Sequence, residues 1–410
     1  MSVRVCVIGG GAAGLMAAGR AAELGASVLL LERNEKCGKK IYITGKGRCN
    51  VTNDCQRTEF FQNIMRGAKF LQSSYSAFGS AQTMSFFEGN GCPLITERGN
   101  RVFPQSGKAS DITKALISYC QRYGAQIAYN SHVTGIETDG GSVIAVRTDT
   151  GRIECDALII ATGGMSYPAT GSTGDGYGFA RAAGHTVAAL RPSLVPFITA
   201  PDAVAGLAGL TLKNTGVKLM HGGKKIAEQF GELLFTHRGV SGPTVLTLSA
   251  AADVSSGGYS LSLDLKPALS EGALDARVLK DFALNKSKQL SNSLFELLPR
   301  ALVPKIIEQS DISPEKFVHS ITASERRALV STLKGFTLPI LSAGGYTEAV
   351  VTAGGVDLKE IDPKTMRSKL IKGLYFCGEV LDIDALTGGF NLQIAFTTGR
   401  CAGQWAASAD

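Results

Sequence analysis

The sequence predicts an α/β protein whose Rossmann-type domain is interrupted by an inserted β-rich domain and a helical subdomain. Near the N-terminus, an apolar run Val3–Ile8, a helix-forming stretch Ala12–Leu24 and a second apolar run Ser27–Leu31 follow one another as a βαβ unit. Residues 191–267 hold short β-type runs between turn glycines. Residues Leu269–Lys334 instead place apolar side chains at helical spacing. A βαβ unit followed by a β-rich region and then a helical region indicates one α/β fold with two insertions.

Composition excludes several classes of protein. The 410 residues include 44% apolar and 19% charged residues, and the formal net charge is +7. A mild positive charge suits an anionic partner such as RNA, although many small-molecule enzymes are equally basic. Nine cysteines without a C-x-x-C pair argue against a disulfide framework, a zinc site or a dithiol redox centre, and the scattered histidines argue against any metal site. This cysteine usage fits a reducing, cytoplasmic compartment, and no segment has the roughly 18 uncharged apolar residues of a membrane span.

The middle of the first domain has β character. The runs Gln126–Asn130, His132–Thr138, Ser142–Thr148 and Arg152–Cys155 alternate around turn signals, which predicts a β-meander. The uninterrupted apolar run Ala157–Ala161 follows it and predicts a buried parallel strand.

The two insertions differ in character. The runs Gly216–Met220, Lys225–Gln229 and Tyr259–Asp264 predict a small barrel or sandwich. After the helical part, the chain returns to the first domain. There Gly373–Gly378 is again strand-like, and Phe390–Ala407 has the composition of a closing helix. The apolar stripe of the helical part consists of Leu294, Leu297, Leu298, Leu302 and Ile306. The predicted domains are 1–190 plus 357–410, 191–267 plus 336–356, and 268–335.

The strongest motif is a G-x-G-x-x-G directly after the first strand. Gly9 permits the tight turn, Gly11 lets the backbone approach a pyrophosphate at the helix N-terminus, and Gly14 lets helix and strand pack closely. Glu32 ends the second strand and suits the hydroxyl groups of a ribose. The sequence therefore predicts a dinucleotide site.

Later segments favour FAD over NAD as that dinucleotide. Flavoproteins of the glutathione-reductase type place a meander, then a strand ending in A-T-G, then a late strand ending in G-E after the first βαβ unit. Here Ala161–Gly163 follow the meander, and Gly378, Glu379 and nearby Asp382 follow the late strand. Because no second G-x-G-x-x-G is present, we expect NAD(P)H to bind only transiently against the flavin.

Two more segments are expected at the flavin. Gly389 opens the last helix, whose N-terminus would face the pyrimidine ring and stabilise negative charge on it. A glycine-spaced basic loop at residues 38–50 would grip the pyrophosphate and line the ring. Within that loop Cys49 is either a proton donor or a packing residue.

The complete set of predicted cofactor-binding residues is Gly9, Gly11, Ala12, Ala13, Gly14, Glu32, Arg33, Lys40, Gly45, Gly47, Arg48, Cys49, Asn50, Val133, Ala161, Thr162, Gly163, Gly378, Glu379, Asp382, Gly389, Phe390 and Asn391. A polar, glycine-rich run at residues 234–243 lies inside the first insertion and offers His237 as an acid or base and Arg238 as a phosphate ligand for a substrate. A purely structural loop explains that run equally well.

Taken together, the motifs resemble the BaiN/RdsA-type FAD-dependent oxidoreductase family. The shared motifs are the GRCN loop at 47–50, ATGG at 161–164, LLFTHRG-SGP at 233–243, T-x-GGV-D at 352–357 and GEV-D…GG-N-Q at 378–393. The resemblance covers essentially the whole chain. It implies a discontinuous FAD domain, a β-barrel-like insertion and a helical insertion.

The resemblance also implies flavin-dependent reduction of a carbon–carbon double bond. Our leading hypothesis is reduction of uridine to dihydrouridine in 23S rRNA, with NAD(P)H as the small-molecule reductant, Cys49 as a possible acid, and basic residues of the insertions on the RNA backbone. The second hypothesis is an ene-reductase or dehydrogenase acting on steroid- or bile-acid-like molecules. The third is a non-catalytic protein whose FAD is structural.

Overall fold

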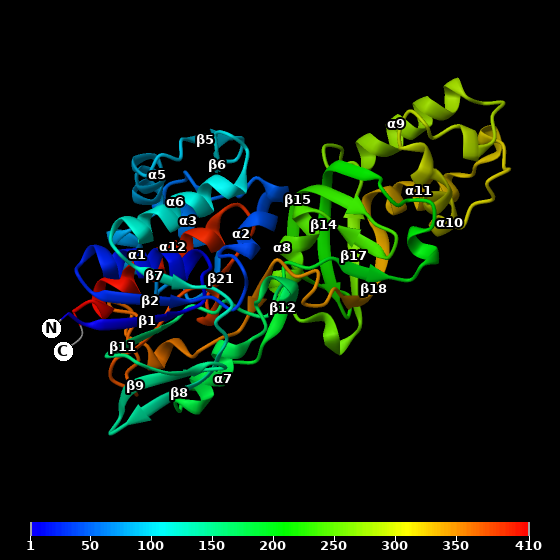
Figure 1. Cartoon of the computed structure of the whole chain (residues 1–410). Coiled ribbons are helices and arrows are strands. Elements are labelled where there is room, and N and C mark those ends of the chain that lie inside the picture. Colours follow the sequence, from blue (N-terminus) through cyan, green and yellow to red (C-terminus); the bar gives the residue numbers. More distant parts are fainter. Residues whose placement is uncertain (1, 409–410) are drawn as a thin grey trace. The chain divides into compact units, whose positions relative to one another are not determined.

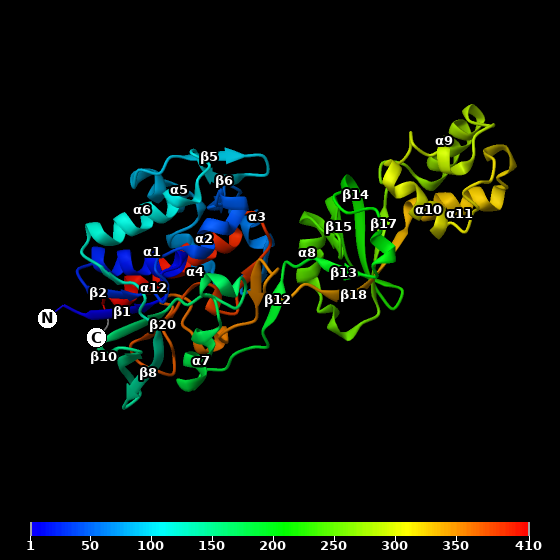
Figure 2. The same ribbon diagram turned by 45° about the vertical axis from the view of Figure 1, so that its right-hand side comes forward.

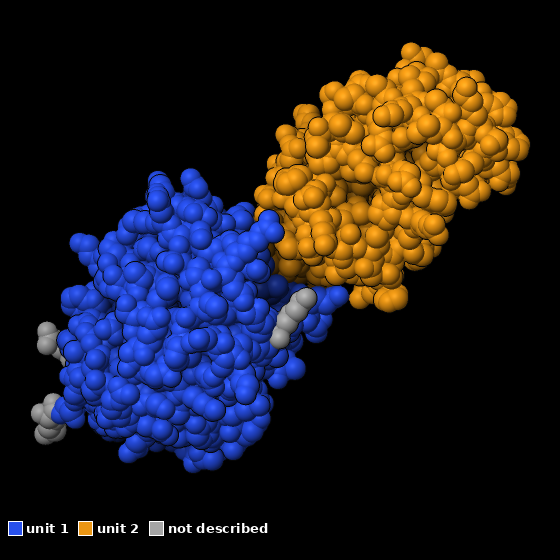
Figure 3. Space-filling model, turned by 90° about the horizontal axis from the view of Figure 1, so that it is seen from above, with its two compact units in different colours: residues 1–193, 346–410 blue, residues 194–345 orange. Residues whose placement is uncertain are grey.

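The computed structural model describes residues 2–408, which divide into two compact units. The first unit comprises Met1–Ser193 and Tyr346–Asp410, and the second is Leu194–Gly345 (Figure 3). Each unit has its own apolar core. No helix among the described residues is long and apolar enough to cross a bilayer.

A five-stranded parallel sheet forms the centre of the first unit, in the order β20-β11-β1-β2-β7. Its strands are β1 (Arg4–Ile8), β2 (Ser27–Leu31), β7 (Gln126–Ala128), β11 (Ala157–Ile160) and β20 (Leu374–Phe376). Strands buried on both faces need continuous apolar sequence, and β11 is buried along its whole length. The predicted βαβ unit and the late strand are thereby confirmed.

Three helices cover one face of this sheet, as Figures 1 and 2 show: α1 (Ala12–Glu23), α6 (Ala109–Arg122) and α12 (Phe390–Ala406). The opposite face carries the antiparallel strands β8 (Val133–Asp139), β9 (Ser142–Thr148) and β10 (Gly151–Glu154). Helix α1 packs closely on its neighbours because its residues are small. A Cβ at Gly19, for example, would lie 2.2 Å from the ring of Tyr119 in α6.

One part of the predicted meander was wrong. Residues 126–128 form β7, which pairs with β2 in the parallel sheet, with Leu30 opposite Ile127. Helix α6, absent from the sequence-based description, supplies the crossover that makes such parallel pairing possible. The remaining three runs form the antiparallel meander as expected.

Residues 39–104 fold into short elements beside the sheet. They are α2 (Lys39–Ile43), η1 (Thr44–Gly47), β3 (Thr52–Asn53), α3 (Arg57–Gln62), β4 (Ile64–Arg66), α4 (Gln72–Ala77), α5 (Ser80–Gly89), β5 (Leu94–Glu97) and β6 (Arg101–Pro104). The first unit is completed by η2 (Pro168–Thr170), α7 (Asp175–Ala182), β12 (Arg191–Ser193), β19 (Val351–Ala353), η8 (Leu358–Glu360), η9 (Gly378–Val380) and β21 (Asp384–Ala385). Strand β12 pairs with β19, and β21 pairs with β4.

A closed six-stranded barrel forms the centre of the second unit, in the order β13-β16-β15-β14-β17-β18. Its elements are β13 (Phe197–Thr199), η3 (Asp202–Val204), β14 (Thr211–His221), β15 (Lys224–Phe235), β16 (Gly239–Ser241), α8 (Pro243–Ala251), η4 (Val254–Ser256), β17 (Tyr259–Asp264) and β18 (Phe336–Ala343). This decides the earlier choice between barrel and sandwich.

The helical segment belongs to the same unit as the barrel. It contains α9 (Glu271–Leu284), η5 (Leu290–Asn292), η6 (Arg300–Leu302), α10 (Val303–Gln309), η7 (Val318–Ser320) and α11 (Ala323–Lys334). The apolar stripe predicted from Leu294 to Ile306 is buried, and it joins the barrel residues in one core. Barrel and helices therefore support each other, whereas residues 346–356 cluster with the first unit.

Candidate functional site

A cavity in the first unit lies where strands of the parallel sheet end and where α1 and α12 begin. Ligands of open α/β sheets bind at the carboxyl ends of the strands. The residues predicted from sequence that line this cavity are Gly9, Gly11, Ala12, Ala13, Glu32, Arg33, Lys40, Val133, Ala161, Thr162, Gly163, Gly378, Glu379 and Asn391. Segments far apart in the chain thus meet at one site.

The glycines of the first motif fit a pyrophosphate. Gly9 has φ +102°, and a Cβ there would lie 2.6 Å from the carbonyl oxygen of Ala161. A Cβ at Gly14 would lie 1.9 Å from the carbonyl oxygen of Gly9, so helix and strand could not pack. Gly11 differs, because a Cβ there meets nothing within 4 Å and points to open space. It caps α1 without a side-chain hydrogen bond, which leaves the helix N-terminus open to an anion.

Backbone N–H groups hold the Glu32 carboxylate in place at the cavity. Its carboxylate accepts hydrogen bonds from the Gly10 backbone N–H at 2.8 Å and from the Asn34 backbone N–H at 2.8 Å. A Cβ at Gly10 would lie 3.0 Å from Glu32 Oε2 and 2.4 Å from the sulfur of Cys37. Gly10, to which the motif assigned no role, is therefore required for the approach of Glu32.

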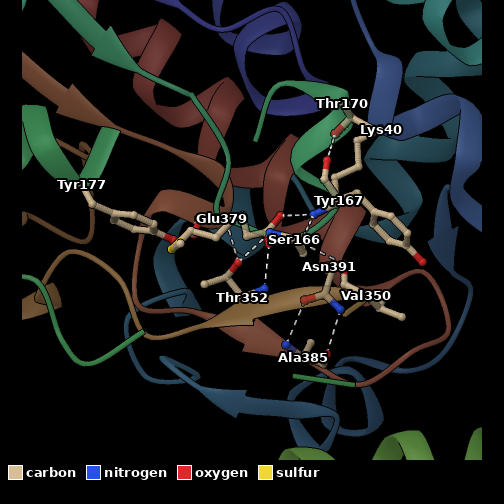
Figure 4. A network of polar contacts seen from close by, with 11 residues as sticks. Lys40, Ser166, Tyr167, Thr170, Tyr177, Val350, Thr352, Glu379, Ala385 and Asn391 are labelled. Carbon is tan, nitrogen blue, oxygen red and sulfur yellow. Dashed lines mark hydrogen bonds and ion pairs between the residues drawn. The ribbon is translucent and has the colours of Figure 1, made fainter. Parts of the chain in front are cut away.

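A charged network borders the cavity (Figure 4). The Lys40 ammonium lies 2.6 Å from Glu379 Oε2 and also donates to the Ser166 hydroxyl. Glu379 Oε1 accepts from the Ser166 hydroxyl at 2.9 Å and from the Thr352 backbone N–H at 2.8 Å. A Cβ at Gly164 would lie 2.5 Å from Thr352 Oγ1 and 2.8 Å from Glu379 Oε1. The second glycine of ATGG thus makes room for this network.

Thr352 joins strand β19 to the network through its hydroxyl, which accepts from the backbone N–H groups of Met165 at 2.7 Å and Ser166 at 3.2 Å. Thr352→Val keeps the shape but removes that acceptor. We expect the first unit to lose on the order of 1–3 kcal/mol of unfolding free energy for each buried N–H group left unpaired. Denaturant titration measures this, and Thr352→Ser, which retains the hydroxyl, should recover most of it.

Polar contacts join three segments of the cavity lining beyond Glu32. Arg33 follows Glu32 and donates to Thr173 at 2.6 Å and to Asp175 at 2.8 Å. His132 lies 3.4 Å from the same Asp175 carboxylate. Arg33, His132 and Asp175 all line the cavity. Because these segments adjoin Glu32, these residues are suitably placed to hold the adenosine part of a dinucleotide.

The start of α12 is held by close contacts between its first residues and the strands β3 and β21. Gly389 has φ +99°, and a Cβ there would lie 2.3 Å from the carbonyl oxygen of Thr52. The Asn391 side chain accepts from the Ala385 N–H at 3.0 Å and donates to the Ala385 carbonyl at 2.8 Å (Figure 4). Thr162 also lines the cavity, but its hydroxyl is buried without a hydrogen-bond partner among the described residues. A Cβ at Gly176 would lie 2.1 Å from this oxygen, so the hydroxyl packs against the first turn of α7 and is not exposed to the cavity.

Several predicted residues do not line the cavity. They are Gly14, Gly45, Gly47, Arg48, Cys49, Asn50, Asp382, Gly389 and Phe390. Arg48 is paired with Glu97 and stacks over Phe103, with its guanidinium carbon 4.3 Å from the ring centroid. Cys49 has φ +60° and a fully buried side chain, and burial raises the pKa of its thiol to about 12. Burial also raises the pKa of Asp382, although Arg66 lies 3.8 Å away.

His237 and Arg238 belong to the second unit. They lie in the turn between β15 and β16, where the Thr236 N–H donates to the Gly239 carbonyl at 2.8 Å. Both side chains are exposed on the barrel. Their role toward a substrate stays a prediction.

The sequence analysis did not identify Ser166 or Asp175 as residues of the site. It also did not show that Thr352 takes part in the polar network around Lys40 and Glu379. Ser166 and Glu379 are 213 positions apart in the chain, and only the fold places them side by side. Asp175 could have been found from the sequence. It is an acidic residue directly after Gly174, a pattern typical of a helix start, and this α-helix is the next one in the chain after the ATGG segment. Among the described residues, no group of His, Cys, Asp and Glu is arranged to hold a metal ion.

Known proteins match the chain over nearly its whole length. The model of the HI0933-like protein Rossmann domain family matches residues 3–405. The 3-dehydro-bile acid delta(4,6)-reductase of Clostridium scindens is 32% identical over 98% of this chain and 99% of its own. The ribosomal RNA dihydrouridine synthase of Haemophilus influenzae is 33% identical over 97% of this chain and 96% of its own. The solved 3-ketosteroid-delta4-(5alpha)-dehydrogenase of Rhodococcus jostii RHA1 shares the fold, at TM-score 0.54 and 16% identity over 99% of this chain and 97% of that one.

Proposed function

The chain belongs to the HI0933-like family of flavin-dependent oxidoreductases, and from this premise we propose that it reduces uridine to dihydrouridine in 23S rRNA. The observation that carries the proposal is the end-to-end similarity to a ribosomal RNA dihydrouridine synthase, whose length this chain matches. The net charge of +7 supports an anionic substrate.

The cavity residues fit FAD. The open N-terminus of α1 at Gly11 would hold the pyrophosphate, and Glu32 would bind the adjacent ribose. FAD bound there would supply hydride transfer from NAD(P)H to C6 of uridine, with a proton added at C5.

Protein charges around the ring would favour the reduced form. The N-terminus of α12, reached through Asn391, would set its backbone N–H groups toward the pyrimidine edge. The Lys40 ammonium also lies at the cavity wall, where it is paired with the Glu379 carboxylate and held by the Ser166 hydroxyl, so the pair contributes an oriented dipole. Such pre-oriented dipoles and charges stabilise negative charge as it develops.

Mapping of dihydrouridine in rRNA tests the proposal. In a strain lacking the gene, primer extension across 23S rRNA should lose a dihydrouridine signal that the wild-type gene restores on complementation. A dihydrouridine pattern that is unchanged by the deletion would remove the rRNA reading.

A second candidate is the reduction of a steroid-like molecule, favoured by the 32% identity to a bile acid reductase over nearly the full length. Parallel assays of NAD(P)H oxidation with rRNA and with unsaturated steroids separate the two functions. The third candidate is a non-catalytic protein whose FAD is structural. In that case the yellow absorbance of the flavin would fail to bleach on anaerobic mixing with NADH or NADPH.

The proton donor can be sought at Cys49. The raised pKa keeps the thiol protonated at neutral pH, as a donor requires, but the side chain is fully buried and does not line the cavity. We therefore expect Cys49→Ala to leave flavin reduction and substrate reduction within about threefold of wild type, well below the effect of losing a general acid. Stopped-flow absorbance follows each half-reaction separately. A loss of about 100-fold confined to substrate reduction would assign protonation to this thiol.

A further inference from the structure

The helical part of the second unit carries an exposed patch that combines aromatic and basic side chains. We call it the Phe317 patch, and it consists of Leu284, Lys286, Lys288, Phe317 and His319. The side chain of Leu284 is 76% exposed and that of Phe317 is 47% exposed. All five residues lie within the second unit, so the patch is described without reference to the first.

Backbone contacts hold the two halves of the patch together. The segment after α9 pairs with the segment before η7 through a bridge between Gln289 and Phe317. The Val318 N–H donates to the Lys288 carbonyl at 3.0 Å, and His319 Nδ1 lies 2.9 Å from the Lys286 carbonyl. The relative position of the two halves of the patch is therefore fixed by the backbone and not by side-chain rotamers alone.

The rings are presented for stacking. Phe317 and His319 are themselves stacked, with ring centroids 5.7 Å apart and planes 25° from parallel. Exposed flat rings of this kind bind the faces of unpaired bases, and each such base–ring contact contributes about 1–3 kcal/mol.

The two lysines next to the rings form no ion pair within the described part of the chain. Both Lys286 and Lys288 are exposed. Of the acidic residues near these segments in the chain, Asp281 is bound by Arg277 at 2.9 Å, and Glu315 accepts from the Ser313 hydroxyl at 3.0 Å. Lys316, beside Phe317, is bound to Glu325. Two free ammonium groups thus flank the exposed rings.

We propose that the Phe317 patch docks a single-stranded segment of RNA, with Lys286 and Lys288 on the phosphates and with Phe317 and His319 against a base. This inference rests on the proposed function, since it gives the RNA substrate a landing site on the insertion. Single-stranded RNA is favoured over duplex because only unstacked bases expose their faces. It is favoured over a membrane because Leu284 and Phe317 together are a small apolar surface for insertion into lipid.

The test is anisotropy of a labelled, unstructured RNA oligonucleotide titrated with holoprotein at several salt concentrations. For the double variant Lys286→Gln/Lys288→Gln, the slope of log affinity against log salt should fall by about 1.4, which is about 0.7 per lost phosphate contact. For Phe317→Ala/His319→Ala, affinity should fall about fivefold or more with an unchanged slope.

A matched control exists in the same unit. The side chain of Phe295 is 38% exposed, and the guanidinium of Arg300 lies 4.9 Å from its ring centroid. Phe295→Ala/Arg300→Gln removes one ring and one cation but should leave RNA affinity unchanged. Equal losses in control and patch variants, absence of RNA binding by wild type, or tighter binding to anionic vesicles than to RNA would overturn the proposal.

The outcome is separable from that of the proposed function. If rRNA dihydrouridine persists in the deletion strain while patch variants lose RNA affinity, the proposed function fails and the patch stands. If dihydrouridine disappears in that strain but the patch variants bind RNA normally, only the patch is overturned.

Discussion

Gly11→Val is expected to give a folded protein that no longer retains FAD. Gly11 has φ −80° and ψ −170°, which valine adopts without strain, and a Cβ there meets no atom within 4 Å. The added side chain would fill the space that the pyrophosphate needs at the start of α1. We expect affinity for FAD to fall at least about 100-fold, equivalent to about 2.8 kcal/mol. Absorbance of the purified protein and titration with FAD measure the loss, and circular dichroism checks the fold.

Gly14→Ala provides the contrast. A Cβ at Gly14 would lie 1.9 Å from the carbonyl oxygen of Gly9, so the contact between strand and helix must break. This variant should be misfolded or insoluble, whereas Gly11→Val should remain soluble. If Gly11→Val were purified yellow with a full complement of FAD, the cavity would not be the pyrophosphate site.

The parts of the fold that were predictable have a long, regular pattern. Strand β1 contains a continuous apolar run and helix α1 is a helix-forming run of twelve residues, and the core of the helical segment shows its stripe from Leu294 to Ile306. Elements such as β3, with two residues, and α3, with six, are too short to show any period. Helix α6 did carry a helical stripe of buried residues, and recognising it would have placed residues 126–128 in the parallel sheet.

The site residues also fall into a group that the sequence predicted and a group that only the fold brought together. Gly9 and Gly11 of the glycine motif, and Glu32 at the end of the next strand, were assigned to the cofactor because their spacing within one βαβ unit carries a mechanism. The network of Lys40 with Ser166 was not visible, because these residues belong to segments 126 positions apart and are common on any surface. The T-x-GGV-D motif was recognised as a pattern, but the role of Thr352 appeared only when its hydrogen bonds were seen.

The position of the last helix depends on two glycines with a spacing of four. A Cβ at Gly399 would lie 2.3 Å from the carbonyl oxygen of Ala13, and one at Gly403 would lie 2.2 Å from that of Ala17. These contacts advance together along both helices, so α12 and α1 run in the same direction with their backbones in contact. Both N-termini therefore reach the same cavity. A larger residue at this contact would move one helix start away from the other.

Gly399→Ala should consequently destabilise the protein by on the order of 3 kcal/mol, because overpacking against backbone cannot be relieved by a rotamer change. The sign is the informative part, since alanine in place of glycine usually stabilises a helix. Gly178→Ala in α7 meets nothing within 4 Å and should gain about 0.4–1 kcal/mol. Denaturant titration of both variants decides the matter. A stabilising Gly399→Ala would mean that α12 does not press against α1, and the shared direction of the two helix dipoles toward the cavity would lose its structural basis.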